Sequence, residues 1–208
     1  MNPIKRRTFV KAGLASSVIG FPSLGQALGA NDRVQVALVG CGGRGTQVTS
    51  SLVSRSDVVC TQLCDIHEER LVRTADFIAK QQGGRKPLLA THMEEIFANK
   101  DVDAVVVATP DHWHALMTIH ACEAGKDVYC EKPLTLTIDE GKQICQAVQE
   151  TGQVFQVGTQ QRSEMGLRFL KAVALLRDRR IGDVQRVDVA IGGSPTSGPI
   201  PKADYPTH

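Results

Sequence analysis

Short apolar runs rich in valine alternate along the chain with longer stretches in which apolar residues recur at helical spacing. The short runs predict five β-strands, at residues 33–39, 57–65, 104–108, 128–130 and 154–159. A helical stretch follows each of the first four strands, and these stretches end near residues 54, 82, 124 and 152. Strands that alternate with helices in this way predict an α/β fold, with a doubly wound parallel sheet of the Rossmann type.

Local signals at the helix ends agree with these boundaries. Thr137 and Glu140 have the spacing of a capping box for the fourth helix, and Asp111 is expected to cap the third. Glycines at 83–84, 125 and 152 follow three of the helices, where a left-handed residue commonly ends a helix.

The pattern changes near the end of the chain. In residues 183–191, Val187, Val189 and Ile191 alternate with other side chains, which predicts one more strand. Residues 192–208 are rich in proline, glycine and serine and predict a loop. We therefore expect one complete domain at 31–160 and the truncated start of an α/β open-sheet domain at 161–208, in a fragment of a longer protein.

The composition and charge of the chain argue against one class of function, nucleic-acid binding. Hydrophobic residues make up 42% of the 208 residues and charged residues 22%, as in a globular protein. The formal net charge of +2 includes +4 from residues 1–30, so the rest of the chain carries −2. With no basic excess in its body and only 4% aromatic residues, the chain is expected not to bind nucleic acid.

The first thirty residues are expected to be an export signal. A basic start is followed by a modestly apolar stretch at 12–21 and by small residues at 27–30. Arg6-Arg7-Thr8-Phe9-Val10-Lys11 resembles the twin-arginine signal, which implies export to the periplasm. The apolar stretch is too short to span a bilayer, so no stable membrane association is expected after export. The alternative is a disordered basic tail.

The strongest chemical signal is the turn Gly40-Cys41-Gly42-Gly43-Arg44-Gly45, which has the form G-x-G-x-x-G between a strand and a helix. Gly40 is expected to permit the tight turn, Gly42 to let the backbone approach a pyrophosphate, and Gly45 to let the helix pack close to the strand. Free N–H groups at the start of the helix then bind the pyrophosphate. The alternative is a glycine turn with no ligand.

Asp65 lies 20 residues after Gly45, at the end of the second strand. Its carboxylate is expected to accept hydrogen bonds from the adenosine ribose and to repel a 2′-phosphate, which favours NAD over NADP. Arg44 is expected beside the phosphates, although a solvated surface arginine is the alternative.

Two further turns follow apolar strands, at the edge of the sheet where such folds bind ligands. The first contains Thr109, Pro110, His112 and His114, for which cofactor contact, packing at the helix start and catalysis all remain open. A metal at these histidines lacks a complete ligand set, and a site at Cys60, Cys64 and His67 is a lesser alternative, so no metal is expected.

The second of these turns is Glu131-Lys132-Pro133. A lysine beside a nicotinamide can donate a hydrogen bond to a substrate oxygen or relay a proton. A charged surface turn is the alternative.

Five features occur in this order along the chain: the glycine turn, the strand end at Asp65, Ala-Thr-Pro-Asp-His-Trp-His, Tyr-Cys-Glu-Lys-Pro and Val-Gly-Thr-Gln-Gln-Arg-Ser. With this set, the chain resembles the glucose–fructose oxidoreductase/inositol dehydrogenase (Gfo/Idh/MocA) family over residues 34–191. The resemblance implies an NAD(P)-dependent oxidoreductase that acts on a hydroxyl of a sugar or cyclitol, and a homo-oligomer when the chain is full length. It makes Lys132 the catalytic lysine and places Glu131 at the nicotinamide side. It assigns the cofactor cleft to Thr109, Pro110 and His112, and places Gln160 and Arg162 near the way into the second domain.

The family's downstream His/Asp pair is not present in these 208 residues, so we expect the chain to bind NAD(H) but to turn over poorly. Two alternatives remain open at this point. One is an NAD-dependent glycoside hydrolase of the same superfamily, although the intact Glu131-Lys132-Pro133 favours a dehydrogenase. The other is a non-catalytic nucleotide-binding remnant.

Overall fold

The computed structural model describes residues 33–162, 165–190 and 192. They fall into two compact units that divide between Gly158 and Thr159. The expected export signal at 1–30 and most of the expected loop at 192–208 lie outside the described residues. Within the described residues, no helix is both long and apolar enough to cross a membrane.

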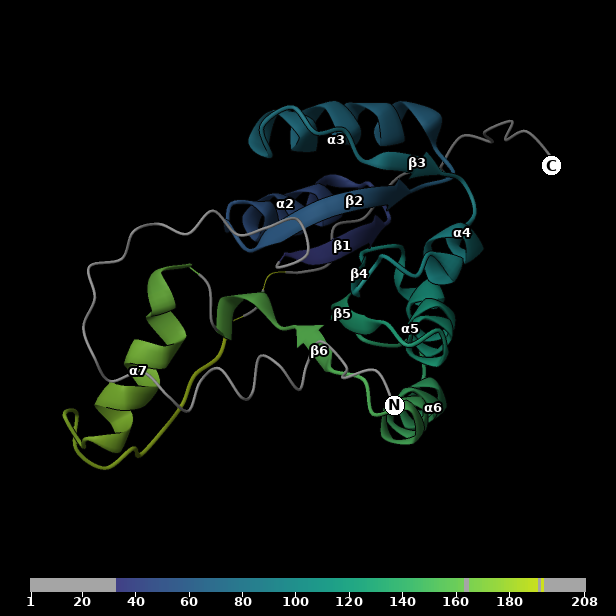
Figure 1. Cartoon of the computed structure of the whole chain (residues 1–208). Helices are drawn as coiled ribbons and strands as arrows, with labels where there is room; N and C mark the ends of the chain where they lie inside the picture. Colours follow the sequence, from purple (N-terminus) through teal and green to yellow (C-terminus); the bar gives the residue numbers. More distant parts are fainter. Residues whose placement is uncertain (1–32, 163–164, 191, 193–208) are drawn as a thin grey trace, which may run out of the picture. The chain divides into compact units, whose positions relative to one another are not determined.

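The first unit contains a parallel sheet with the strand order β3-β2-β1-β4-β5-β6 (Figure 1). The strands of the described chain are β1 (Val34–Val39), β2 (Val58–Cys64), β3 (Leu88–Ala90), β4 (Ala104–Val107), β5 (Asp127–Glu131) and β6 (Phe155–Gly158). Since β1 pairs with β2 on one side and with β4 on the other, the strand order reverses beside β1. Sheets of this kind bind ligands at the carboxyl ends of the strands at that reversal.

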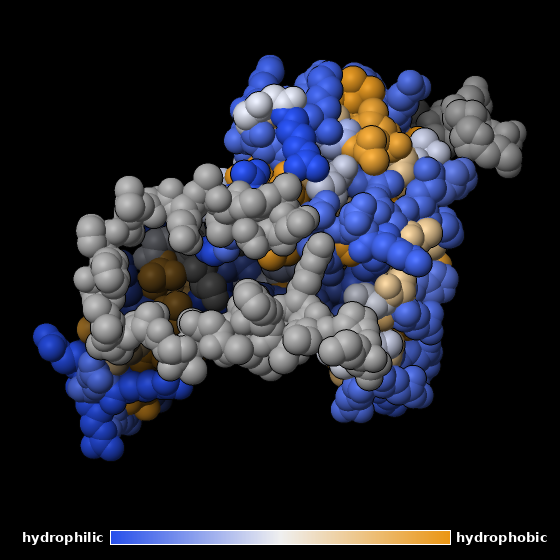
Figure 2. Space-filling view, viewed as in Figure 1, coloured by the Kyte–Doolittle hydropathy of each residue, from blue (hydrophilic) through white to orange (hydrophobic). Residues whose placement is uncertain are grey.

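Helices connect the strands and cover both faces of the sheet. They are α2 (Gly43–Val53), α3 (Glu68–Gln81), α4 (Met93–Ala98), the 3₁₀ turn η2 (Asp111–Trp113), α5 (His114–Glu123) and α6 (Ile138–Thr151). Figure 2 shows a mainly hydrophilic outer surface on α3 and α6, with an apolar patch where α3 and β3 lie together.

The core consists of two clusters, one on each face of the sheet. On β1, Val36 and Leu38 pack with residues of α2 and α3, while Ala37 and Val39 pack with residues of α4 and α5. β4 alternates in the same way. Val106 belongs to the cluster with α2 and α3, and Val105 and Val107 belong to the cluster with α4 and α5. Both faces of the central strands are therefore buried, which explains their continuous apolar sequence.

The structure confirms the α/β fold, the five predicted strands and the four predicted helices. The capping box at Thr137 is formed, and Gly125 and Gly152 have the positive φ expected after a helix. The cap at Asp111 is wrong: the chain first forms η2, and the Asp111 side chain accepts from the neighbouring N–H of His112 at 3.0 Å. Pro110, which has no N–H, precedes this turn and favours an extended approach to it.

The sequence pattern did not reveal β3 and α4. β3 has three residues, two of them exposed, so it has no alternation long enough to detect. α4 has six residues, and its N-cap is His92, which forms a capping box with Glu95 although histidine is an uncommon residue type at this position.

The second unit contains η3 (Gln160–Arg162), η4 (Met165–Leu167) and α7 (Arg168–Arg177). The strand predicted at 183–191 is wrong over its described part, because residues 183–190 pair with no described strand; Ile191 lies outside the described residues. A strand requires a neighbour to bond its N–H and C=O groups, and alternation alone does not supply one.

Candidate functional site

The turns singled out in the sequence meet at one edge of the sheet. The glycine turn follows β1, Asp65 follows β2, Thr109 follows β4, and Lys132 follows β5. Because β1 and β4 are neighbours and β5 lies next to β4, their turns stand side by side at the reversal of strand order. The topology therefore brings together the residues that the sequence had placed on separate strands.

Close packing requires two glycines of the first turn. Gly40 has a φ of +97°, and a Cβ on it would lie 2.6 Å from the backbone of Ala108. A Cβ on Gly45 would collide with the carbonyl oxygen of Gly40 and contact Leu38. These positions thus hold the start of α2 against β1 and β4, as the sequence predicted for a dinucleotide turn.

Gly42 and Gly43 face open space instead. A Cβ on either would have no neighbour within 4 Å, and no side chain caps the start of α2 at Gly42. The first N–H groups of a helix have no partner within the helix and favour an anion. The bare backbone at this point fits a pyrophosphate group, with Gly42, Gly43 and Gly45 as the residues that would hold it.

Asp65 is fixed by two backbone N–H groups. Its Oδ2 accepts from Cys41 at 2.7 Å, and its Oδ1 accepts from His67 at 2.8 Å. The carboxylate is therefore tied to the glycine turn at the end of β2, and each oxygen keeps further acceptor capacity for a ribose hydroxyl.

Arg44 and Glu131 form an ion pair that joins the glycine turn to the end of β5. Arg44 Nε donates to Glu131 Oε1 at 2.9 Å, and the side chain of Glu131 is only 5% exposed. The hydroxyl of Tyr129 donates to the same oxygen at 3.1 Å, and burial together with Glu131 raises the pKa of Tyr129 to about 12. Tyr129 therefore remains a neutral donor near neutral pH. The sequence placed both charged residues at the site but did not pair them, and it missed Tyr129.

Lys132 is exposed at the carboxyl end of β5, directly after the buried Glu131. Its backbone N–H donates to Glu131 Oε2 at 3.3 Å, and its peptide bond to Pro133 is cis. An exposed ammonium between two anchored neighbours is accessible to a bound molecule.

The two histidines after β4 differ in their surroundings. His112 is exposed and lies 3.8 Å from Asp111, whereas His114 is buried at the start of α5. The ring nitrogens of His114 lie 2.8 Å from the carbonyl oxygen of Pro133 and 2.9 Å from that of Thr109. His112 is thus accessible to a bound molecule, while His114 cannot contact a substrate directly. The hydroxyl of Thr109 lies 3.6 Å from the sulfur of Met117, and Pro110 is exposed.

Gln160 and Arg162 lie in η3, which belongs to the second unit. The backbone N–H of Arg162 donates to the carbonyl of Thr159 at 3.3 Å, and Gln160 has a φ of +46°.

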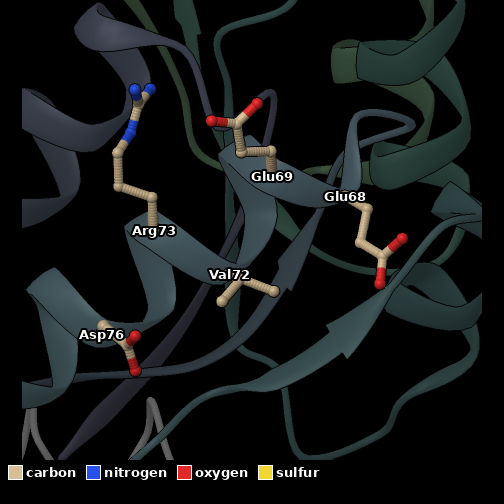
Figure 3. A pocket seen from close by; sticks show the side chains of 5 residues that line it. All are labelled: Glu68, Glu69, Val72, Arg73 and Asp76. Atoms are coloured by element: carbon tan, nitrogen blue, oxygen red, sulfur yellow. The ribbon is translucent and has the colours of Figure 1, made fainter.

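The cysteines do not form a metal centre. Cys145 is exposed and the other five are buried, with burial raising the pKa of the Cys60 thiol to about 12. In the part of the chain that the structure describes, no three His, Cys, Asp or Glu side chains come together to hold a metal. A hollow lined by Glu68, Glu69, Val72, Arg73 and Asp76 lies along the first turns of α3, which follows β2 (Figure 3).

Comparisons with known proteins agree with this geometry. A family model described as an oxidoreductase family with an NAD-binding Rossmann fold matches residues 34–159. An α-N-acetylgalactosaminidase from Shewanella oneidensis is 32% identical over 176 residues, which cover 73% of this chain and 38% of that protein. The chain thus spans less than half the length of the curated relatives it matches.

Solved structures show the same fold. GenD2 from gentamicin A biosynthesis, in complex with NAD, is 29% identical with a TM-score of 0.62, covering 77% of this chain and 43% of that one. The myo-inositol 2-dehydrogenase from Lactobacillus plantarum has a TM-score of 0.64 at 24% identity, covering 73% of this chain and 43% of that one, a likeness that shows the fold alone. From the match over more than half of its length, and from the glycine turn that fits a pyrophosphate, the chain belongs to the Gfo/Idh/MocA family of oxidoreductases with an NAD-binding Rossmann fold.

Proposed function

We propose that this protein is the cofactor-binding part of an NAD-dependent dehydrogenase that acts on a hydroxyl of a sugar or cyclitol. The observation that carries the proposal is the exposed Lys132, which stands at the same edge of the sheet as the bare glycine turn and Asp65. This arrangement supports a role for the lysine as a hydrogen-bond donor to a substrate oxygen beside a bound dinucleotide.

The residues have distinct roles in this proposal. Gly40, Gly42, Gly43 and Gly45 shape the pyrophosphate site, and Thr109, Pro110 and His112 line the cleft. The bound cofactor supplies the acceptor or donor of hydride. The ammonium of Lys132 donates a hydrogen bond to the substrate oxygen and stabilises the negative charge that this oxygen carries while deprotonated, before hydride leaves the adjacent carbon in oxidation or after hydride adds to the carbonyl in reduction.

Asp65 supports NAD rather than NADP as the cofactor. Its two oxygens are held by backbone N–H groups at the end of β2, so the carboxylate is fixed where the adenosine ribose is expected. A 2′-phosphate at this point meets a negative charge, whereas a 2′-hydroxyl finds an acceptor.

A second candidate is an NAD-dependent glycoside hydrolase, which the 32% identity to the Shewanella oneidensis α-N-acetylgalactosaminidase favours. The intact Glu131-Lys132-Pro133 turn favours the dehydrogenase. The two differ in outcome: a dehydrogenase produces NADH in proportion to substrate, while a hydrolase of this kind releases a free sugar without net NADH.

The remaining features of the proposal concern location and partners. The basic leader with Arg6-Arg7 supports export to the periplasm by the twin-arginine pathway, with no stable membrane association afterwards. The acidic body supports a small carbohydrate partner rather than nucleic acid. A homo-oligomer is proposed for the full-length protein.

The test uses the single tryptophan, Trp113, which lies in η2 a few residues after the carboxyl end of β4. Titration of the 208-residue chain with NADH should quench its fluorescence by energy transfer, and NADPH should bind about tenfold more weakly because of Asp65. Asp65→Ser should reduce this tenfold difference in affinity, while Asp57→Ser, at a half-buried aspartate before β2, should leave it unchanged. If the wild-type chain binds neither nucleotide, the proposed function is wrong.

A further inference from the structure

His114 is the buried histidine of the site, and its ring lies between two of the site's turns. It is 1% exposed. Nε2 lies 2.9 Å from the carbonyl oxygen of Thr109, five residues before it, and Nδ1 lies 2.8 Å from that of Pro133, nineteen residues after it. One ring therefore connects the turn after β4 to the turn after β5.

His114 differs in side-chain size and polarity from the other buried residues of α5. The other buried residues of this helix are Ala115, Thr118, Ala121 and Cys122, which are small. His114 is larger, and both of its nitrogens face backbone oxygens of the site. An apolar side chain of similar volume would fill the space equally well, so packing alone does not explain a histidine at this point.

One of the two carbonyls that His114 contacts belongs to Pro133, the residue directly after Lys132. On the other side of Lys132, the carboxylate of Glu131 is held by Arg44 at 2.9 Å. The exposed lysine thus stands between two neighbours that are each anchored to another turn. We propose that His114 is a positioning residue, which fixes the Pro133 turn to the Thr109 turn and thereby sets the place of Lys132 at the nicotinamide side of the proposed cofactor site. The role of Lys132 in this statement rests on the proposed function.

Asparagine and glutamine can separate the two contacts. The amide nitrogen of asparagine lies near the position of Nδ1 and that of glutamine near Nε2. His114→Asn therefore keeps a donor for Pro133, and His114→Gln keeps one for Thr109. Each variant keeps an N–H donor for one carbonyl and removes the ring nitrogen that faces the other, a local change that hydrogen exchange can detect.

The first experiment is hydrogen exchange of the 208-residue chain without cofactor, read by mass spectrometry. His114→Asn should speed exchange about tenfold in residues 109–113 and leave 131–136 unchanged, and His114→Gln should do the reverse. His120→Gln, at an exposed histidine of the same helix, should change neither segment. The proposal is overturned if both segments keep wild-type exchange in both variants. It is equally overturned if exchange rises to the same extent in β1 and β2, because His114 then acts only on overall stability.

The second experiment compares NADH with ADP-ribose, which lacks the nicotinamide. His114→Gln, which loosens the turn beside Lys132, should weaken NADH binding about fivefold and leave ADP-ribose binding unchanged. Equal weakening of both ligands contradicts a role in placing Lys132. A wild-type chain that binds neither ligand refutes the proposed function instead. The exchange experiment then still decides whether His114 connects the two turns, because it contains no cofactor.

Discussion

Arg44 lies inside the glycine motif, where a phosphate contact is the obvious expectation for a cation. The structure gives it a protein partner, since its Nε donates to the buried Glu131 and its Nη1 to Gln47 at 3.1 Å. A carboxylate that is 5% exposed requires such a partner, because an uncompensated buried charge is costly. Arg44 therefore links the glycine turn to the turn that contains Lys132.

A double-mutant cycle on NADH affinity separates these two roles of Arg44. We expect Arg44→Gln to weaken NADH binding about tenfold in the wild-type chain and less than twofold in a Glu131→Gln background, because the arginine acts through the carboxylate. Arg55→Gln, which removes an exposed arginine paired with Asp57, is the control. An equal loss in both backgrounds means that Arg44 binds the phosphates directly.

For single residues, the sequence predicts the positions of those that directly follow a recognisable strand. The glycine turn, Asp65 and Lys132 each follow a recognisable strand, so their positions at the carboxyl ends could be predicted. The pairing of Arg44 with Glu131 spans 87 residues and depends on how β1, β4 and β5 are ordered in the sheet. The contact between His114 and Pro133 has the same origin, and no local signal distinguishes His114 from His112.

Among the secondary-structure elements, length and neighbours decide what the sequence can predict. β4 and residues 36–39 of β1 have continuous apolar sequences and are buried almost throughout, whereas β3 has three residues and is an edge strand of the sheet. Residues 183–190 show the opposite case, because they alternate like a strand and pair with no described strand. Alternation predicts which residues share a face, but pairing depends on a partner elsewhere in the chain.

In α6, a glycine-to-alanine substitution is expected to change the free energy of unfolding in opposite directions at two positions. Gly152 ends the helix with a φ of +69°, so Gly152→Ala should lower the free energy of unfolding by about 1 kcal/mol. Gly141 lies within the first turns of the helix, and a Cβ on it would be 3.7 Å from Thr135 Oγ1, an ordinary contact. Gly141→Ala should therefore raise the free energy of unfolding by up to about 1 kcal/mol. Urea denaturation measures both, and a shift of the two midpoints in the same direction would contradict the assigned end of α6.

The whole molecule consists of two units that differ in how their residues are buried. The first unit contains the two core clusters on either face of the sheet. In the second unit, every residue from 166 to 190 is exposed, including Phe169, Leu170 and Val173 of α7. A ten-residue helix without a buried face is marginal in water, because most helical stability in proteins comes from packing. The proposed cofactor site therefore depends on the first unit for its stability.

This difference predicts where the native chain is cleaved first. Under limiting trypsin, we expect the earliest cuts within 165–190 to fall at Arg168, Lys171 or Arg177, because the second unit opens locally at little cost in free energy. A protease specific for glutamate provides the contrast, since residues 166–208 contain no glutamate and its sites in α3 and α6 lie on helices packed against the sheet. Mass spectrometry of the first fragments should show a trypsin product that keeps residues 33–158 intact. Initial cleavage at Arg73 in α3 or Lys142 in α6 would contradict this prediction, because it would mean that a helix with a buried face opens before the second unit does.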